Sequence, residues 1–323
     1  MPLIASPIAD PASRATLARG ALLSRLFEGL CFAAATVILV VIAGLLVALG
    51  IGAWPAIRTF GFSFLTVSTW NPVTDVYGAA GPIVGTLLTS ALALAVALPV
   101  AVGVAFFLTE LCPAILRRPI GTAVELLAGI PSIVYGMWGL FVFAPVFTKS
   151  VQLPAMAAAP TGSIWEKLTT GIPNGSGILP ASLILAIMIL PFMAATLRDL
   201  LLTVPPGVRE SAYGLGATTK EVTLSVTLPY VRNGAIGAMM LGLGRALGET
   251  MAVTFIIGNS HALPNSLFAS GSTIASTIAN EFTEATSDMH LSALIALGLV
   301  LFVITFAVLA LARLLVGWQA RRA

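Results

Sequence analysis

Long apolar runs alternate with short polar segments along the chain, and almost all charged residues fall in the short segments. A helix needs about 20 predominantly apolar residues to cross the hydrocarbon core of a bilayer. The runs that reach this length predict six transmembrane helices, at about residues 26–51, 81–108, 120–147, 178–200, 233–257 and 291–316. Proline inside the fourth run is compatible with a span, because neighbouring helices can satisfy the freed carbonyl groups.

The composition agrees with this pattern. Of the 323 residues, 58% are hydrophobic and 9% are charged, whereas about 25% are charged in an ordinary soluble domain. We therefore expect an all-α, polytopic membrane protein, with a membrane domain at residues 26–316 and cytoplasmic tails at residues 1–25 and 317–323. A cleaved signal peptide is the alternative for the first run, but that run is longer than the apolar region of such a peptide.

The basic residues predict the orientation of the spans. One alternating set of segments holds twelve of the sixteen lysines and arginines, namely Arg14, Arg19, Arg25, Arg117, Arg118, Arg198, Arg209, Lys220, Arg232, Arg313, Arg321 and Arg322. The other set holds Arg58, Lys149 and Lys167, and Arg245 lies inside the fifth span. Because basic residues of short loops stay on the cytoplasmic side, both termini are predicted to be cytoplasmic. No basic stripe interleaved with aromatic residues indicates nucleic acid.

The loop at residues 204–232 is too polar to enter lipid but more regular than a linker. Two prolines and a glycine at residues 205–207 end the preceding helix, and residues 208–215 predict a short helix that stops at Gly216.

A second short helix follows this glycine. Thr218 and Glu221 have the spacing of a capping box, so we expect the helix to begin there and to run toward Leu228 and Pro229. Two short helices joined by a glycine turn would form a compact projection on the cytoplasmic face. We call residues 208–229 the knob.

The fifth predicted span contains two charges, Arg245 and Glu249, four residues apart. On a continuous helix they lie one turn apart on the same face, where they can pair and reduce the cost of burial. In the first hypothesis the pair pins this helix to its neighbours, and Gly244 and Gly248 let another backbone approach. In the second, favoured hypothesis this face lines a translocation path, where the guanidinium binds an oxyanion.

The third predicted span holds two further candidates. Glu125 lies near its cytoplasmic end, where a boundary carboxylate reaching water is the favoured interpretation and a contact with Arg245 or with a loop arginine is the alternative. Pro131 and Ser132 are expected to break or bend the helix, so that Ser132 either lines the path or merely follows a kink.

The remaining reactive side chains give no strong signal. A group of histidines and carboxylates brackets the last external loop, at His261, Glu281, Glu284, Asp288 and His290. It lacks the spacing of metal ligands, and we expect a solvated acidic loop. Cys31 and Cys112 form no C-x-x-C pair.

The knob also resembles a known family, the permease subunits of bacterial binding-protein-dependent ABC importers. Their cytoplasmic loop has the form E-A-A, three residues, G, nine residues, I-x-L-P. The matching residues here are Glu210, Ala212, Gly216, Leu228 and Pro229. Ser211 and Val226 are mild departures from the pattern. The resemblance implies an ABC importer type I permease fold in which residues 208–229 dock on an ATPase subunit.

Two further stretches, LLAGIPSIVYGMWG at residues 126–139 and LGLGRALGETMAVTFIIGN at residues 241–259, resemble the C-type permease subunits of phosphate-specific importers. This resemblance implies import of inorganic phosphate across the inner membrane by alternating access. It also implies a second homologous permease subunit, two copies of an ATPase subunit and an external phosphate-binding protein as partners. ATP and magnesium are then expected on the ATPase alone.

The chain contains no G-x-x-x-x-G-K-[ST] motif, so it does not cradle nucleotide phosphates itself. We expect a non-catalytic membrane subunit in contact with lipid. The alternatives are a permease for sulfate or molybdate, a proton-coupled secondary transporter that uses Glu249 as a relay, and a membrane scaffold or sensor without transport.

Overall fold

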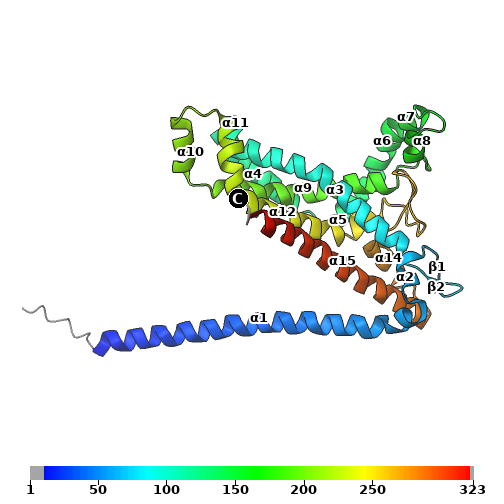
Figure 1. Cartoon of the computed structure of the whole chain (residues 1–323), viewed down its shortest axis with the longest axis horizontal. Helices are drawn as coiled ribbons and strands as arrows, with labels where there is room; N and C mark the ends of the chain where they lie inside the picture. Colours follow the sequence, from blue (N-terminus) through cyan, green and yellow to red (C-terminus); the bar gives the residue numbers. More distant parts are fainter. Residues whose placement is uncertain (1–10, 321–323) are drawn as a thin grey trace, which may run out of the picture. The chain divides into compact units, whose positions relative to one another are not determined.

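The computed structural model describes the backbone of residues 11–320 and the side chains of residues 24–314. Its elements in chain order are α1 (Pro11–Phe60), α2 (Ser63–Thr66), β1 (Trp70–Asn71), β2 (Val76–Tyr77), α3 (Ala80–Phe106), η1 (Phe107–Leu111), α4 (Ala114–Ala128), α5 (Ser132–Trp138), η2 (Gly139–Phe143), α6 (Ala144–Phe147), η3 (Thr148–Gln152), α7 (Leu153–Ala157), α8 (Ile164–Thr169), α9 (Ile178–Leu202), α10 (Pro206–Gly214), α11 (Thr219–Val222), η4 (Thr223–Thr227), α12 (Leu228–Leu247), α13 (Met251–Thr254), α14 (Ile274–Glu281) and α15 (Asp288–Ala320) (Figure 1). The η elements are π-helical.

The all-α prediction is confirmed, because the two strands have two residues each and form only a small antiparallel hairpin. Among the described residues, five helical stretches are long and apolar enough to cross a membrane, namely Ser24–Phe60, Ala80–Leu111, Ser132–Ala157, Ile178–Leu202 and Asp288–Leu314. The predicted span at 233–257 is not among them. Six spans are therefore not confirmed.

The chain divides into two compact units, Met1–Ile51 and Gly52–Ala323. Within the first unit, α1 begins at Pro11, so the part of the predicted tail from residue 11 to residue 25 is helical. Residues 1–10 lie outside the described residues, as do residues 321–323 at the other end. α15 of the second unit continues through residues 317–320 of the predicted C-terminal tail.

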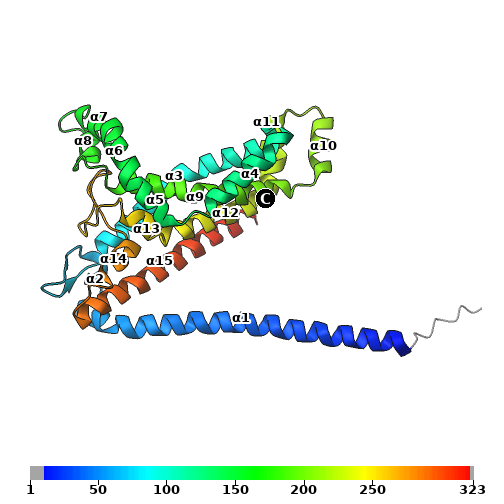
Figure 2. The same cartoon turned by 180° about the vertical axis from the view of Figure 1, so that it is seen from behind.

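Helix α9 is the centre of the second unit. It packs against α3, α4 and α12. Figures 1 and 2, which view the molecule from opposite sides, both show these helices running beside it. Four alanines of α3, spaced four residues apart at 93, 97, 101 and 105, are fully buried. Small side chains at this spacing let two helix backbones approach closely, which is how helices pack without a hydrophobic driving force in lipid.

The N-terminus of α9 is satisfied by a distant segment. The backbone N–H groups of residues 177–179 donate to carbonyl groups in the segment between α13 and α14, over 2.8–3.1 Å. The first N–H groups of a helix have no partner within it and need one from outside. The segment after α13 is therefore held against the centre of the unit.

The predicted third span, 120–147, is broken just before Ser132, which confirms the break expected at Pro131 and Ser132. α4 ends at Ala128, and α5 begins at Ser132 after a break at residues 129–131. Pro131 has no N–H to donate and disfavours helical backbone at Ile130, which explains the break. α4 carries the exposed Arg117 and Arg118, and the membrane-length stretch starts only after the break.

The predicted fifth span is interrupted as well. α12 already begins at Leu228, ends at Leu247, and is followed by the separate short helix α13. Gly248 has φ −94° and ψ 2°, which takes the chain out of the helical path. Both interruptions fall in the two stretches that resemble phosphate importers, and they set the geometry of the site.

Candidate functional site

Arg245 lies in the last turn of α12, and its guanidinium carbon is 5.7 Å from the centre of the Phe192 ring on α9. Such a distance allows a cation–π contact. Among the described residues, no carboxylate pairs with Arg245. The site therefore contains a cation whose hydrogen-bond donors are not engaged by an acidic side chain.

The predicted pairing of Arg245 with Glu249 is wrong. It required a continuous helix, but α12 ends at Leu247 and the chain turns away at Gly248. The Glu249 carboxylate instead accepts a hydrogen bond of 3.3 Å from the backbone N–H of Ala252 in α13. The hypothesis that the two charges pin the helix by pairing with each other loses its premise.

Ser132 is the first residue of α5 and is half-buried. α5 packs tightly on α13, since a Cβ added at Gly136 would lie 2.9 Å from the carbonyl oxygen of Met251. Tyr135 of α5 donates to the Leu127 carbonyl across the break at 2.9 Å, and it lies within the electrostatic field of Arg245. The two interrupted helices thus meet where α5 packs on α13, with Tyr135 on the side of α5 that is within reach of the charge of Arg245.

This arrangement suits an anion. Discontinuous helices at membrane depth are found where the backbone lines a binding site or a water-filled path. A guanidinium presents five donors in a planar fork that matches an oxyanion. An arginine without a carboxylate partner beside two helix breaks can therefore bind an oxyanion, and Ser132 and Glu249 lie on the elements that flank it.

The knob has the predicted turn. Gly216 has φ +88°, a conformation that side chains disfavour, and it separates α10 from α11. The capping box is also confirmed, because Thr218 accepts from the Glu221 N–H and the Glu221 carboxylate accepts from the Thr218 N–H. These hydrogen bonds hold the pKa of the Glu221 carboxyl below its usual value.

The second knob helix runs toward Leu228 and Pro229, as predicted, but it is not short, because it continues past them into α12. α11, η4 and α12 follow one another without a gap from Thr219 to Leu247. Proline lacks the N–H for an ordinary helical bond to the residue four positions earlier, and π-helical turns are a common way to accommodate such local irregularity. The knob is therefore continuous with the helix that carries Arg245.

The family-motif residues occupy different environments. Glu210 is exposed and has no ion-pair partner among the described residues, and Gly216 is also exposed. Ala212 is half-buried. Leu228 packs against the core of the second unit, whereas Pro229 is exposed at the start of α12. Glu210 and the turn are thus available at the surface, while Leu228 fastens the knob to the core.

The main anchor of the knob is an ion pair that leaves no signal in the sequence. Arg209 Nη1 of α10 lies 2.7 Å from Glu110 Oε1 of η1, and both side chains are largely buried, at 17% and 11% exposure. Arg209 also donates to the carbonyl of Leu201 near the end of α9. The pair joins residues 99 positions apart, so no local spacing could reveal it.

Glu125 pairs with Arg198 of α9 at 2.6 Å and not with Arg245. Its side chain is 52% exposed. The favoured interpretation as a boundary carboxylate agrees with this exposure.

The prediction of a solvated acidic loop is wrong for three of its residues. Glu281 is 15% exposed and lies 2.7 Å from Nε2 of His261 and 2.9 Å from Nε2 of His290. It also accepts a 2.6 Å hydrogen bond from the Trp70 indole. Burial acts to raise the pKa of the Glu281 carboxyl, but these hydrogen bonds outweigh burial and hold the pKa below its usual value. Glu284 and Asp288 are exposed, as expected.

Comparison with known families now gives the class of protein. Residues 97–321 match the model of the family described as "Binding-protein-dependent transport system inner membrane component". The match covers most of the chain, including the knob and both interrupted helices. The chain therefore belongs to this family of inner-membrane transport components.

Three relatives narrow the class of transport component to which the chain belongs. The chain is 54% identical over 309 residues to the phosphate transport system permease protein PstC of Mesorhizobium japonicum, with 96% of this chain and 94% of the relative covered. Proteins with the same name from Pasteurella multocida and Haemophilus influenzae are 53% and 52% identical, with 86% and 87% of this chain and 87% and 89% of the relatives covered. Within the family, the chain groups with the PstC permeases.

A solved structure of the MetNI methionine ABC transporter is more distantly similar. It shares 20% identity with this chain, covers 71% of this chain and 90% of its own, and superposes with a TM-score of 0.48. The family assignment rests on the sequence matches alone.

Proposed function

We propose that this chain is the permease subunit of an ATP-driven importer that moves inorganic phosphate across the inner membrane. The observation that carries the proposal is 54% identity to a phosphate transport permease along almost the whole length of both chains. Arg245, which has no carboxylate partner among the described residues and lies beside two interrupted helices, gives the chain a chemically suitable group for phosphate.

In the proposed path, Arg245 binds the phosphate oxyanion. Ser132 and Glu249 flank it, the hydroxyl as a hydrogen-bond partner and the carboxylate as a repulsive group that keeps phosphate from binding too tightly. The guanidinium remains charged at any physiological pH. The site therefore attracts an anion without needing a proton from the medium.

Transport is coupled through the knob. An ATPase subunit carries ATP and magnesium and docks on α10, where Glu210, Val208 and Tyr213 are exposed. ATP binding closes a pair of ATPase subunits, the knob moves with them, and the path opens outward to accept phosphate from an external binding protein. A second homologous permease completes the path, and hydrolysis returns it to the inward-facing state.

Both chain termini are cytoplasmic in this proposal. Within the second unit, α10 and α11 lie at the end opposite to α6, α7 and α8 (Figures 1 and 2). The unequal distribution of basic residues supports the assignment of the α10 end to the cytoplasm. A cysteine at Asn265 should react with a membrane-impermeant reagent from outside, and one at Lys220 should not. The reverse labelling would overturn this orientation.

The function is tested by ATP-driven uptake of labelled phosphate into proteoliposomes that contain the purified complex. We expect uptake to require ATP and to resist excess sulfate and molybdate. Competition by either anion would favour the alternative oxyanion permease. Uptake driven by a proton gradient without ATP would favour a secondary transporter, and no flux would favour a scaffold.

A substitution at Glu249 also distinguishes the proposed importer from a proton-coupled transporter. A proton relay needs a titratable group, so Glu249→Gln should abolish transport in a proton-coupled mechanism. In the proposed importer this variant keeps ATP-driven uptake, with an altered affinity for phosphate. Loss of all uptake in a correctly assembled Glu249→Gln complex would contradict the role given to this residue.

A further inference from the structure

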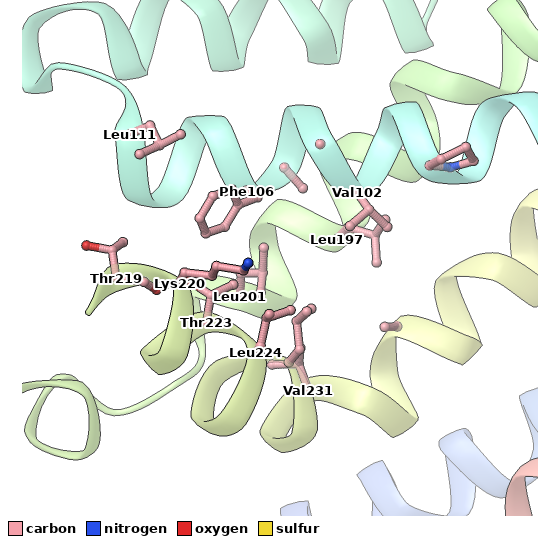
Figure 3. A pocket seen from close by; sticks show the side chains of 15 residues that line it. Val102, Phe106, Leu111, Leu197, Leu201, Thr219, Lys220, Thr223, Leu224 and Val231 are labelled. Atoms are coloured by element: carbon pink, nitrogen blue, oxygen red, sulfur yellow. Dashed lines mark hydrogen bonds between the residues drawn. The ribbon is translucent and has the colours of Figure 1, made fainter. Parts of the chain in front are cut away.

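A cavity of about 560 Å³ lies beside the knob, between the last turns of α3, the end of α9 and the segment formed by α11, η4 and α12 (Figure 3). Its wall is almost entirely apolar, with Val102, Phe106, Leu197, Leu201 and Val231 among the lining side chains. Its volume falls in the range of pockets that hold small ligands, which is about 300–1,000 Å³. Nothing in the proposed transport path uses this cavity.

The mouth of the cavity combines exposed apolar residues with one cation. Leu111 and Leu224 line it and are 58% and 54% exposed. Figure 3 shows Lys220 of α11 reaching toward the cavity between Phe106 and Leu201. Among the described residues, Lys220 has no ion-pair partner.

The nearby carboxylates are already engaged. Glu221, the next residue, accepts hydrogen bonds from the backbone N–H and the hydroxyl of Thr218. Glu110 is paired with Arg209. The ammonium group of Lys220 is therefore left for an anion that arrives from outside the chain.

The position of the cavity along the membrane-length helices indicates what kind of anion could bind there. Its lining comes from the ends of two membrane-length stretches, Ala80–Leu111 and Ile178–Leu202, at the point where they meet the polar knob. At such a boundary an acyl chain meets the apolar wall and a lipid headgroup meets the lysine. We propose that the cavity binds an anionic glycerophospholipid, with an acyl chain between α3 and α9 and the phosphate at Lys220.

Bound lipid would lie directly against α11 and η4, the part of the knob that leads into α12. The lipid is thus placed where it can stabilise the knob relative to the spans. This site is independent of the substrate, so its test does not depend on phosphate transport.

The test uses the delipidated full-length chain in detergent, incubated with an equimolar mixture of phosphatidylglycerol and phosphatidylcholine. Native mass spectrometry counts the lipids retained. One basic residue near an anionic lipid contributes about 1 kcal/mol, which is about a fivefold preference. Lys220→Ala should remove about this preference for phosphatidylglycerol, whereas Lys167→Ala, at an exposed lysine on α8, should not.

The second part of the test fills the cavity with a larger side chain. Gly103 lines the cavity, and a Cβ added there has no neighbour within 4 Å. Gly103→Leu should therefore reduce retention of both lipids without disturbing the fold. Gly44→Leu in α1 is the matched control, because a Cβ at Gly44 also meets nothing within 4 Å.

Two results would overturn the proposal. The first is equal retention of the two lipids by the unmodified chain, together with unchanged retention in Gly103→Leu. The second is a protein in the cavity in place of lipid. It is tested in the assembled complex with a photoreactive benzoylphenylalanine in place of Leu224. Crosslinking to lipid supports the proposal, whereas crosslinking to a partner subunit assigns the cavity to a protein interface.

Discussion

Arg209 and Arg245 are both partly buried arginines, but their surroundings differ. Arg209 lies against Glu110 and the end of α9, so its charge is neutralised and its position fixed. Arg245 lies over the Phe192 ring and has no carboxylate partner among the described residues. A buried cation with a partner is an anchor, whereas a cation without one remains available for an anion from outside.

The two arginines are also linked through the chain. Arg209 fixes the knob to η1 and to the end of α9. The knob continues directly into α12, which carries Arg245 in its last turn. A movement of the knob therefore has a direct helical connection to the proposed phosphate site. Separate substitutions at the two positions should affect different properties of the protein.

The largest expected effect is on the anchor. Removing one member of a buried ion pair leaves the other uncompensated, which costs about 3–5 kcal/mol of stability. Arg209→Gln and Glu110→Gln should each lower the thermal stability of the purified protein and weaken ATPase association, and the double variant should be less destabilised than the sum. Glu125→Gln is the control, because its pair with Arg198 is half-exposed and should contribute about 1 kcal/mol or less. Equal effects of the two pairs would contradict the anchor role.

The next largest expected effect is on phosphate uptake. A hydrogen bond to a charged group contributes about 1.5–3 kcal/mol, so Arg245→Gln should reduce phosphate uptake per intact complex by about 10- to 100-fold. Arg245→Lys keeps the charge and loses the planar fork, so its phosphate uptake should lie between that of the unmodified protein and that of Arg245→Gln. Thermal stability should change little, because no buried carboxylate is left behind. Unchanged uptake in Arg245→Gln would remove this residue from the path.

A third effect concerns the external end, where one carboxylate has three donors. Glu281→Gln should cost about 1–3 kcal/mol of stability at neutral pH, because charge-assisted hydrogen bonds are lost. The pKa of Glu281 is lowered on folding, so its contribution is present above the unfolded pKa and disappears as pH falls through the folded pKa. The stability difference between the two proteins should therefore be full at neutral pH and should close as the pH falls through the lowered pKa of folded Glu281.

Thermal unfolding followed as a function of pH measures this difference. Glu284→Gln is the matched control, since Glu284 is exposed and lies outside the cluster. A stability difference that persists unchanged in acid would show that the charge of Glu281 is not what stabilises its contacts with Trp70, His261 and His290.

The smallest effect is on the knob turn. Left-handed backbone costs a residue with a Cβ about 1–2 kcal/mol, so Gly216→Ala should destabilise the turn by about this amount and weaken ATPase association. Gly207→Ala is the control, because an added Cβ at either glycine meets nothing within 4 Å and only Gly216 has positive φ. In helical backbone, alanine at residue 207 should be neutral or stabilising by up to about 1 kcal/mol. Matching behaviour of the two variants would contradict a role for backbone conformation.

Local patterns predicted the features that depend on neighbouring residues. The apolar runs located α3, α9 and α15, because burial in lipid requires about 20 consecutive apolar residues. The capping box and the positive φ of Gly216 followed from side chains within a few positions. Arg245 was found for the same reason, since a charge inside an apolar run is visible without a structure.

Only the tertiary structure decided which of these residues meet. Hydropathy does not report whether a helix is continuous, so the break at Gly248 was missed, and with it the separation of Arg245 from Glu249. The break at residues 129–131 was predicted, because Pro131 is visible in the sequence. The pair of Glu110 with Arg209 and the histidines around Glu281 join distant segments, and no spacing along the chain encodes such contacts. The sequence determined where apolar surface and charge had to lie, because the free-energy cost of burying a charge or exposing an apolar run depends on residues that are neighbours in the chain. The packing of α9 against its neighbours determined the pairing, because a partner is defined by proximity in space.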